Sequence, residues 1–357
     1  MDSVVQQLLE LIKAETIRCS LMEVCGTHTM AIARSGIRGV LPPNIRLLSG
    51  PGCPVCVTSQ GDLDAVIDLA EQEDITLVTF GDMLRVPGSH GSLQEARSRG
   101  ADVRVVYSPL ETLEIARQRP ERQVVFLGIG FETTAPAVAV TVQRAHQLGL
   151  KNLSVYSVHK IIPPALEAIF SDPEVQVDGL ICPGHVSIVL GLEPFEKLAA
   201  RYHKPMVVTG FEAEDILEGI GMLVRQLKTG TARAELQYRR VVRAQGNPAA
   251  RQVLDQVFTP VDAAWRGLGI IPASGLDLRP QYADYNARRR FQIKPQQRYE
   301  IPGCSCGAIL SGKLNPDQCP LFGKACTPTQ PVGPCMVSQE GACAAFYRYQ
   351  PLRSAEV

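Results

Sequence analysis

The sequence predicts an α/β fold built on two parallel sheets. Short apolar segments that are typical of strands alternate with amphipathic segments of helical period along most of the chain. The strand segments are apolar almost throughout, as in residues 75–80 and 124–129, which is typical of a sheet covered on both faces. Reactive and polar residues follow directly after these strands, where parallel sheets place their ligand sites. We therefore expect two similar α/β domains that face a central cleft.

The first half of the chain contains four strand segments with helices between them. Residues 4–14 are predicted to form an amphipathic helix, because Leu8, Leu9 and Ile12 share one face. The polar stretch 119–122 breaks the alternation, as a domain junction does. We predict a first domain over residues 1–119, with strands at 21–24, 45–48, 75–80 and 103–106 and helices at 60–71, 93–99 and 110–118.

A second run of four strands is predicted over residues 120–258, which we assign to a second domain. Its expected strands are 124–129, 153–158, 179–182 and 205–209, with helices ending near residue 148 and at 163–170 and 219–227. Residues 253–265 are predicted as a last helix, and the basic run 288–290 as a solvated face. Residues 259–357 form a third, small and irregular domain in this prediction, because Pro, Gly and Cys dominate from residue 302.

Composition limits the class of protein. The chain has 357 residues, of which 45% are hydrophobic and 20% charged, as in a soluble globular protein. Its 36 basic and 36 acidic residues argue against charge-driven binding to nucleic acid or a membrane surface. We see no signal peptide and no apolar run of about 18 residues, so we expect a cytoplasmic protein. In that reducing compartment, eleven cysteines favour metal binding or redox chemistry over structural disulfides.

Two cysteines separated by two residues lie on a predicted strand-to-helix turn. Cys53 and Cys56 follow the strand at 45–48 and precede the helix at 60–71. Backbone amides at a helix start favour negative charge and therefore a thiolate. Such a pair cycles between dithiol and disulfide or holds a soft metal. The alternative, two small buried residues in a tight loop, does not explain why two thiols flank a proline.

Cys25 and His28 repeat this arrangement at the end of the strand at 21–24. If the segment from residue 27 is helical, both side chains lie on the same side of the turn. A histidine near a helix start is more often a cap or a core residue, but its spacing from Cys25 favours a site.

Further polar residues follow two strands of the predicted second domain. Glu132, Thr133 and Thr134 come after the strand at 124–129, and His185 comes after the strand at 179–182. The carboxyl ends of parallel strands are where α/β proteins bind ligands. We therefore include these four residues among the candidate site residues, although helix capping explains the two threonines equally well.

The C-terminal segment contains six cysteines in loop-rich sequence. It cannot build much core, so a bound cofactor is expected to hold it together. The spacing matches neither a zinc knot, which uses two close pairs, nor the usual ferredoxin patterns. An iron–sulfur cluster tolerates more varied spacing and is favoured, while zinc stays open. The six are Cys304, Cys306, Cys319, Cys326, Cys335 and Cys343.

Taken together, these motifs resemble the HypD family of hydrogenase maturation proteins, and the resemblance runs nearly end to end. It is carried by Cys-Gly-Thr-His-Thr at 25–29, Gly-Pro-Gly-Cys-Pro-Val-Cys at 50–56, Gly-Phe-Glu-Thr-Thr at 130–134, Pro-Gly-His-Val-Ser at 183–187, Cys-Pro-Leu-Phe-Gly at 319–323 and Gly-Pro-Cys-Met-Val-Ser-Gln-Glu-Gly-Ala-Cys at 333–343.

The resemblance implies a scaffold on which the Fe(CN)₂CO unit of nickel–iron hydrogenases is assembled. In that family the iron is held together with the small chaperone HypC, and HypE delivers cyanide that HypF makes from carbamoyl phosphate. The finished unit passes to the hydrogenase large subunit through HypC. The resemblance thus implies a redox-active assembly scaffold and not a conventional turnover enzyme.

The resemblance also implies roles for individual residues. Cys25 would bind the iron of the Fe(CN)₂CO unit, with His28 beside it. The family's tail is similar to ferredoxin:thioredoxin reductase, in which a 4Fe-4S cluster passes electrons to a nearby disulfide. The implied cluster ligands are Cys304, Cys319, Cys326 and Cys343, and the implied redox pairs are Cys306 with Cys335 and Cys53 with Cys56.

Two other functions stay open at this point. One is a stand-alone thiol–disulfide oxidoreductase with an iron–sulfur centre, which would bind no iron beyond its cluster. The other is a zinc-stabilised interaction module, in which Cys25, His28, Cys53 and Cys56 close a tetrahedral site.

Overall fold

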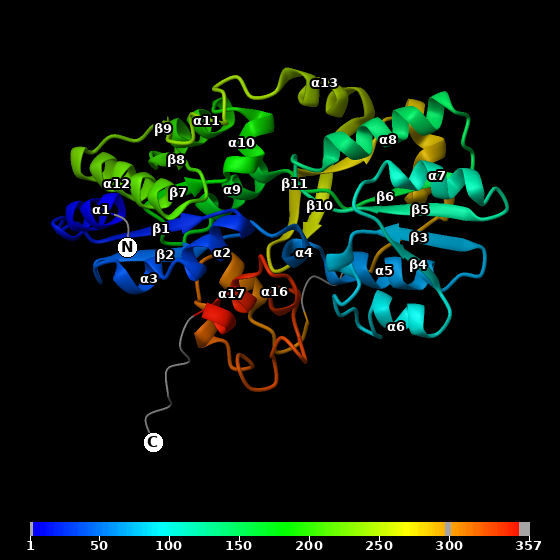
Figure 1. Cartoon of the computed structure of the whole chain (residues 1–357), viewed down its shortest axis with the longest axis horizontal. Coiled ribbons are helices and arrows are strands. Elements are labelled where there is room, and N and C mark those ends of the chain that lie inside the picture. Colours follow the sequence, from blue (N-terminus) through cyan, green and yellow to red (C-terminus); the bar gives the residue numbers. More distant parts are fainter. Residues whose placement is uncertain (1–2, 297–300, 350–357) are drawn as a thin grey trace. The chain divides into compact units, whose positions relative to one another are not determined.

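The computed structural model describes residues 3–296 and 301–349 (Figure 1). The chain divides into two compact units. Unit 1 comprises Met1–Cys56, Ala165–Asn247 and Gly303–Val357, and unit 2 comprises Val57–Pro164 and Pro248–Pro302. These limits differ from the consecutive domains expected from the sequence, because each unit is assembled from segments that lie far apart along the chain.

Unit 1 contains a five-stranded parallel sheet with the order β2-β1-β7-β8-β9. Its core consists of apolar side chains from the sheet and from α1, α2 and α12, among them Leu21, Leu47 and Leu223. Its strands are β1 (Cys19–Glu23), β2 (Ile45–Ser49), β7 (Gly179–Cys182), β8 (Met206–Val208) and β9 (Ala234–Leu236). Its helices include α1 (Ser3–Lys13), α2 (Gly26–Arg34), α3 (Ile37–Val40), α9 (Ile162–Ser171), α10 (Gly184–Leu190), α11 (Glu193–Tyr202) and α12 (Ala213–Thr229).

The cysteine-rich C-terminal segment belongs to unit 1 and has little regular structure. Its short elements are α15 (Cys306–Leu310), η3 (Pro316–Gln318), α16 (Pro334–Val337) and α17 (Ala342–Tyr349). The guanidinium of Arg38 stacks on the Phe346 ring at 5.0 Å, which ties α17 to the segment after α2. A small irregular cysteine-rich region was predicted, and the structure confirms it.

Unit 2 contains a four-stranded parallel sheet with the order β4-β3-β5-β6. Its strands are β3 (Ile75–Thr79), β4 (Asp102–Val105), β5 (Gln123–Gly128) and β6 (Leu153–Ser157). Its helices include α5 (Gln60–Ala70), η1 (Gly81–Met83), α6 (Leu93–Ser98), α7 (Glu111–Gln118), α8 (Ala135–Gln147), α13 (Pro248–Val257), η2 (Pro280–Tyr285) and α14 (Ala287–Arg290). The α/β class with two parallel sheets is therefore confirmed.

The predicted last helix at 253–265 is wrong in its second half. α13 ends at Val257, and β10 (Phe258–Trp265) pairs antiparallel with β11 (Gly269–Leu278). Burial along β10 follows a period closer to two than to 3.6, and Pro260 would interrupt a helix. The expected solvation of residues 288–290 is also wrong for Arg288, whose guanidinium lies 2.6 Å from Asp62 and stacks on Tyr156.

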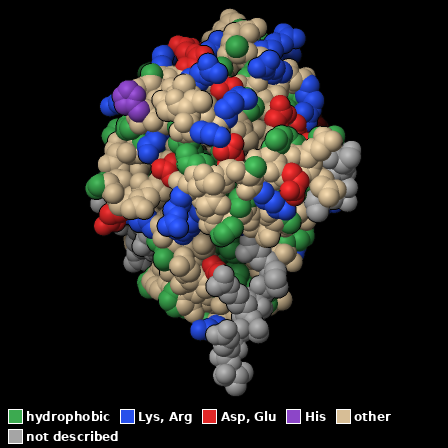
Figure 2. Space-filling view, turned by 90° about the vertical axis from the view of Figure 1, so that its left-hand side faces the viewer, with side chains coloured by type: hydrophobic (Ala, Val, Ile, Leu, Met, Phe, Trp, Pro, Cys, Tyr) green, Lys and Arg blue, Asp and Glu red, His purple; other side chains and the backbone are tan. Residues whose placement is uncertain are grey.

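The face in Figure 2 and the helices give two further observations. On the face drawn in Figure 2, the described basic and acidic side chains intermingle, without the continuous basic stripe that binds nucleic acid. Within residues 3–296 and 301–349, no helix has the length and apolarity that crossing a bilayer requires.

Candidate functional site

The Cys25 and Cys53 loops pack against each other in unit 1. They leave β1 and β2, which are paired in parallel so that Glu23 lies opposite Ser49 at the carboxyl edge of the sheet. The Gly26 N–H donates to the Gly52 carbonyl at 2.8 Å. A Cβ on Gly52 would lie only 2.2 Å from the Cys25 nitrogen, so this close approach requires glycine.

Cys53 and Cys56 form a disulfide, with their Cα atoms 5.2 Å apart. The short helix α4 (Pro54–Val57) begins inside the motif, and both cysteines are buried. The Cys56 N–H lies 3.2 Å from the Cys53 sulfur. The sequence left two uses of these cysteines open, as a redox pair or as metal ligands. The structure contains them as the oxidised form of a redox pair.

The Cys25 thiol is buried at the N-terminal end of α2. Burial raises the pKa of Cys25 to about 12; the carboxylates of Glu340 and Glu23 add to the rise, and the backbone amides of His28 and Thr27 oppose it. Cys25 is therefore a protonated thiol when no metal ion is bound. Its sulfur takes no part in the Cys53–Cys56 disulfide.

His28 is fully buried and held by the backbone. Its Nε2 lies 2.9 Å from the Gly210 carbonyl and 2.9 Å from the Thr209 hydroxyl. Since a carbonyl only accepts, Nε2 carries the proton, and Nδ1 is left as an acceptor with no partner among the described residues. Burial lowers the pKa of His28 to about 4, so the ring is neutral.

His185 joins this group through an aromatic ring. The Phe211 ring lies 4.1 Å from the His185 ring and 4.6 Å from the His28 ring, measured between centroids. His185 is the second residue of α10 and is exposed, whereas His28 is buried. The structure therefore brings Cys25, His28 and His185 to one edge of the unit 1 sheet.

The sequence interpretation missed two carboxylates beside Cys25. Glu23 is fully buried, accepts from the Thr29 hydroxyl at 2.6 Å, and accepts from the Cys25 N–H at 3.2 Å. Burial raises the pKa of Glu23 to about 7. Glu340 accepts from the Thr27 hydroxyl at 2.8 Å. Both had a signal in the sequence, because Glu23 interrupts an apolar strand and Glu340 lies inside the motif at 333–343.

Glu132, Thr133 and Thr134 lie in unit 2, at the carboxyl end of β5. Glu132 is buried, its Oε1 accepts from the Ile162 N–H at 3.0 Å, and Oε2 has no partner among the described residues. The Thr134 side chain forms no capping hydrogen bond with α8, so the structure does not support helix capping as the role of this residue. Their participation in the site, like the predicted central cleft, stays a prediction.

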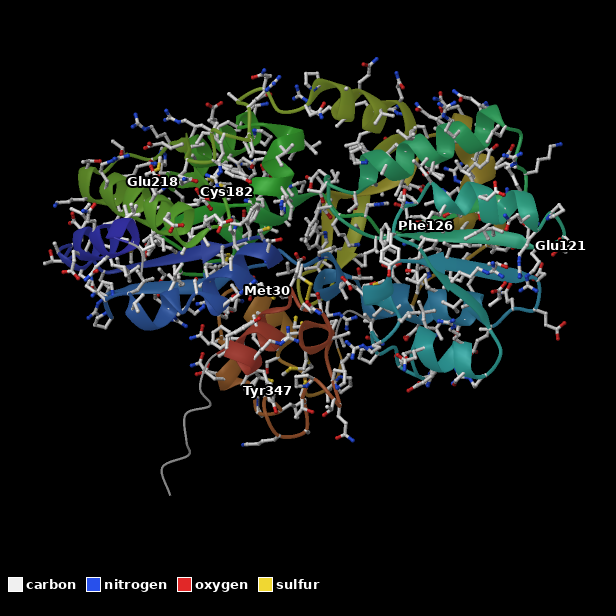
Figure 3. All side chains as sticks on the ribbon, in the orientation of Figure 1. Met30, Glu121, Phe126, Cys182, Glu218 and Tyr347 are labelled. Atoms are coloured by element: carbon white, nitrogen blue, oxygen red, sulfur yellow. A yellow bond between two sulfur atoms is a disulfide. The ribbon has the colours of Figure 1, made fainter. Side chains whose placement is uncertain are left out.

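Five of the six tail cysteines line one small, mostly apolar cavity in unit 1. Figure 3 shows the sulfur atoms gathered in the orange and red C-terminal segment. The sixth, Cys306, has its sulfur 2.8 Å from that of Cys335. The lining cysteines are Cys304, Cys319, Cys326, Cys335 and Cys343.

Backbone amides approach two of these sulfurs. Burial pushes the pKa of Cys319 upward, but hydrogen bonds from Ser305, Leu321 and Phe322 bring it below its usual value. The Val332 N–H lies 3.3 Å from the Cys326 sulfur. A Cβ on Gly333 would lie 2.7 Å from the Cys304 sulfur, so the backbone of Gly333 also lies close to this sulfur. At Cys319 this setting favours the thiolate that a metal cluster requires, whereas hydrogen bonding to Cys306 and burial raise the pKa of Cys304, and burial raises the pKa of Cys343.

These thiols surround a cavity and do not converge on one point. In the described parts of the chain, no three His, Cys, Asp or Glu side chains are arranged to hold a single metal ion. A zinc ion draws its ligands to one point, an arrangement that these thiols lack, whereas a cubane cluster spreads four thiolates around a group of irons. The Cys₃His zinc site is also disfavoured, because two of its thiols are in a disulfide and Nε2 of His28 is engaged.

Comparison with known proteins gives a consistent result over nearly the whole chain. Residues 3–350 match the HypD family model, described as "Hydrogenase formation hypA family". The chain is 48% identical over 344 residues to the hydrogenase expression/formation protein HupD of Azotobacter chroococcum mcd 1, covering 94% of this chain and 91% of that protein. It is 45% identical over 335 residues to the hydrogenase maturation factor HypD of Escherichia coli K12, covering 94% and 90%.

Proposed function

The chain belongs to the HypD family, and we propose that it is a maturation factor for nickel–iron hydrogenases. In this proposal it forms a complex with a HypC-type chaperone, and the Fe(CN)₂CO unit is assembled on that complex. A HypE-type protein supplies cyanide, and the finished unit reaches the hydrogenase large subunit through the chaperone. Assembly is proposed to take place in the cytoplasm, where reducing conditions suit a chain with eleven cysteines.

One observation carries the proposal: a separate thiol and a disulfide lie in contacting loops at one sheet edge. Cys25 supplies a single soft ligand for iron, which is the substrate here. A single thiolate leaves coordination positions open for cyanide and carbon monoxide, which a closed four-ligand site would not. The Cys53–Cys56 disulfide beside it becomes two thiols when it accepts two electrons and two protons.

The residues around Cys25 are proposed to orient ligands and to move protons. Nδ1 of His28 is a buried acceptor without a partner among the described residues, which suits a proton acceptor for an incoming ligand. Glu340 and Glu23 raise the pKa of the Cys25 thiol, which would release its proton to a base or to water as its sulfur binds iron. His185 contacts the same Phe211 ring as His28 and is exposed to a partner or solvent.

The tail cysteines are proposed to hold a resident 4Fe-4S cluster through Cys304, Cys319, Cys326 and Cys343. The shared cavity and the amides directed at the sulfurs support this assignment. Electron transfer is the chemistry that such a cluster supplies when bound. Cys306 and Cys335, with sulfurs 2.8 Å apart, are proposed as a redox pair in the same segment.

A stand-alone thiol–disulfide oxidoreductase is the second candidate, and the Cys53–Cys56 disulfide is the observation that favours it. The two functions differ in whether iron beyond the cluster binds when the HypC-type partner is present. We favour the scaffold because Cys25, a third thiol in contact with that loop, has no role in a simple two-cysteine exchange.

Complementation tests the proposal. A host without its own HypD should regain nickel–iron hydrogenase activity when it receives this chain with its cognate HypC-type chaperone. Cys25→Ala and Cys53→Ser should each abolish that activity without reducing the amount of folded protein. Cys19→Ala, at the opposite end of β1 from Cys25, is the matched control and should leave activity intact. Full activity of Cys25→Ala would contradict the scaffold.

A further inference from the structure

Unit 2 has a cavity of about 390 Å³ that none of the cysteine motifs accounts for. It is lined by the start of α5, the residues that follow β6, the hairpin β10–β11, Arg288 of α14, and residues 295–296. A cavity of this size accommodates a small molecule.

Lys160 is the main reason to regard this cavity as a site. Its residue surface is only 2% exposed, and it lines the cavity. No described residue forms a hydrogen bond or ion pair with its ammonium. Burying an ammonium that forms no hydrogen bond is costly, so such a group usually has a function or a ligand.

The backbone fixes Lys160 in place. Its N–H donates to the Gly130 carbonyl at 2.9 Å, and the next N–H, of Ile161, donates to the Ser274 carbonyl at 2.8 Å. Lys160 also forms a bridge to Gly275 of β11. Both sides of the residue are therefore anchored, and the side chain is held in the cavity wall.

The nearby carboxylate of Asp62 is already satisfied by other groups. Its Oδ1 lies 2.6 Å from the Arg288 guanidinium and 3.2 Å from the Tyr156 hydroxyl, and Oδ2 accepts from the Ser59 hydroxyl at 2.8 Å. Burial lowers the pKa of Lys160, the charge of Asp62 opposes this shift, and the charge of Arg288 adds to it. One carboxylate therefore faces two cationic side chains, which leaves one positive charge for a ligand.

The other titratable groups in the wall set the charge that a ligand should carry. His159 is neutral, since burial lowers its pKa to about 3. Asp277 accepts from the Asn286 side-chain amide at 2.6 Å, and Asp262 lies at the exposed rim. With these acids present, a ligand with one negative charge is favoured over a dianion such as a phosphate ester.

We propose that Lys160 and the cavity around it bind a small aliphatic monocarboxylate. Its carboxylate pairs with the Lys160 ammonium, and its carbon chain lies against Val261, Ala263 and Leu276 of the hairpin. Burial lowers the pKa of Lys160 only to about 8, so the ammonium form still predominates at neutral pH. The proposal concerns unit 2 alone and is independent of the role of Cys25.

Ligand-observed NMR and thermal unfolding of the full chain test this site, with butyrate as the probe. Butyrate should bind saturably and raise the melting temperature, whereas butyramide, its neutral counterpart, should not. Lys160→Met should weaken butyrate binding by at least about tenfold, the usual effect of losing a charge-assisted contact. Lys151→Met, at an exposed lysine of the same unit, is the control and should bind like the parent.

A second variant tests the same site if Lys160→Met does not fold. Val261→Phe keeps the ammonium and fills the cavity, so it should also abolish binding. Three outcomes would overturn the proposal: no butyrate binding to the parent, equal binding of butyrate and butyramide, or undiminished binding to Lys160→Met. Binding of inorganic phosphate in place of butyrate would overturn the assignment to monocarboxylates.

Discussion

At the scale of single residues, burial raises the pKa of the Cys25 thiol more than the helix N-terminus lowers it. The sequence places this cysteine at a helix start, where amides favour a thiolate. The structure adds burial and two carboxylates, which together keep the thiol protonated. A motif shows which residues lie in a turn, but burial depends on the rest of the fold and is not visible in the motif.

Glu132 gives a residue-scale prediction that depends on pH. Burial raises the pKa of Glu132 from 4.5 to about 7, so the folded state holds this proton more tightly than the unfolded state. The resulting stability is fully present below pH 4.5 and is lost as pH rises through 7. The side chain of Glu132→Gln is neutral at every pH, so this variant should lose the pH dependence. Relative to the parent, its free energy of unfolding should rise by on the order of 2 kcal/mol as the pH increases from 4.5 to 7.

Urea unfolding across this pH range measures the Glu132 effect. Glu121→Gln, at an exposed carboxyl of the same unit that Figure 3 labels, is the control and should follow the parent. If the curves for Glu132→Gln and the parent run parallel from pH 4.5 to 7.5, the carboxyl does not titrate as described.

For secondary-structure elements, the contact between the Cys25 and Cys53 loops is the feature that builds the site. β1 and β2 are neighbours in register, so both loops leave the sheet at the same height. Gly52 allows them to touch. The sequence predicted both strands and both turns, but the pairing of β1 with β2 came only from the structure.

Gly52→Ala should separate these loops. Its Cβ would meet the Cys25 backbone at 2.2 Å, so one loop must move. We expect a loss of about 2 kcal/mol or more in stability, typical of severe backbone conflict, together with loss of iron binding in the chaperone complex. Thermal unfolding and iron analysis measure the two effects.

Gly39→Ala is the matched control for Gly52→Ala. Gly39 lies in α3, and an added Cβ there meets nothing within 4 Å. In a helix this change is expected to be neutral or to stabilise by up to about 1 kcal/mol. If Gly52→Ala behaves like Gly39→Ala and binds iron normally, the loop contact does not build the site.

For the whole molecule, the alternation of strands and helices was predictable and the assignment of strands to sheets was not. Periodicity is local, and it located β1 to β8 to within two residues, but it missed β9, β10 and β11. Sheet membership depends on long-range pairing. β7 adds to β1 in unit 1, although some 155 residues separate them, whereas β3 and β4 join β5 in unit 2. No local pattern distinguishes these partners.

The C-terminal segment supplies a prediction about the whole molecule. Anaerobically prepared protein should carry about four cluster irons with equivalent sulfide and a broad brown absorption. Cys319→Ala or Cys343→Ala should remove them and lower the melting temperature, because this segment has little core of its own. Cys182→Ala, a buried cysteine of the unit 1 sheet, is the control and should keep its iron. Stoichiometric zinc without iron or sulfide would contradict the cluster.

The most direct test of the scaffold is the infrared spectrum of the complex with the HypC-type chaperone, purified without oxygen. The parent and Cys19→Ala should show the bands of iron-bound cyanide and carbon monoxide. His28→Ala should weaken those bands without moving them, since loss of an outer-shell partner costs about 10–100-fold in metal affinity or activity. Cys25→Ala should lack them entirely. Full-strength bands in Cys25→Ala would show that the iron is bound elsewhere and would contradict the central assignment.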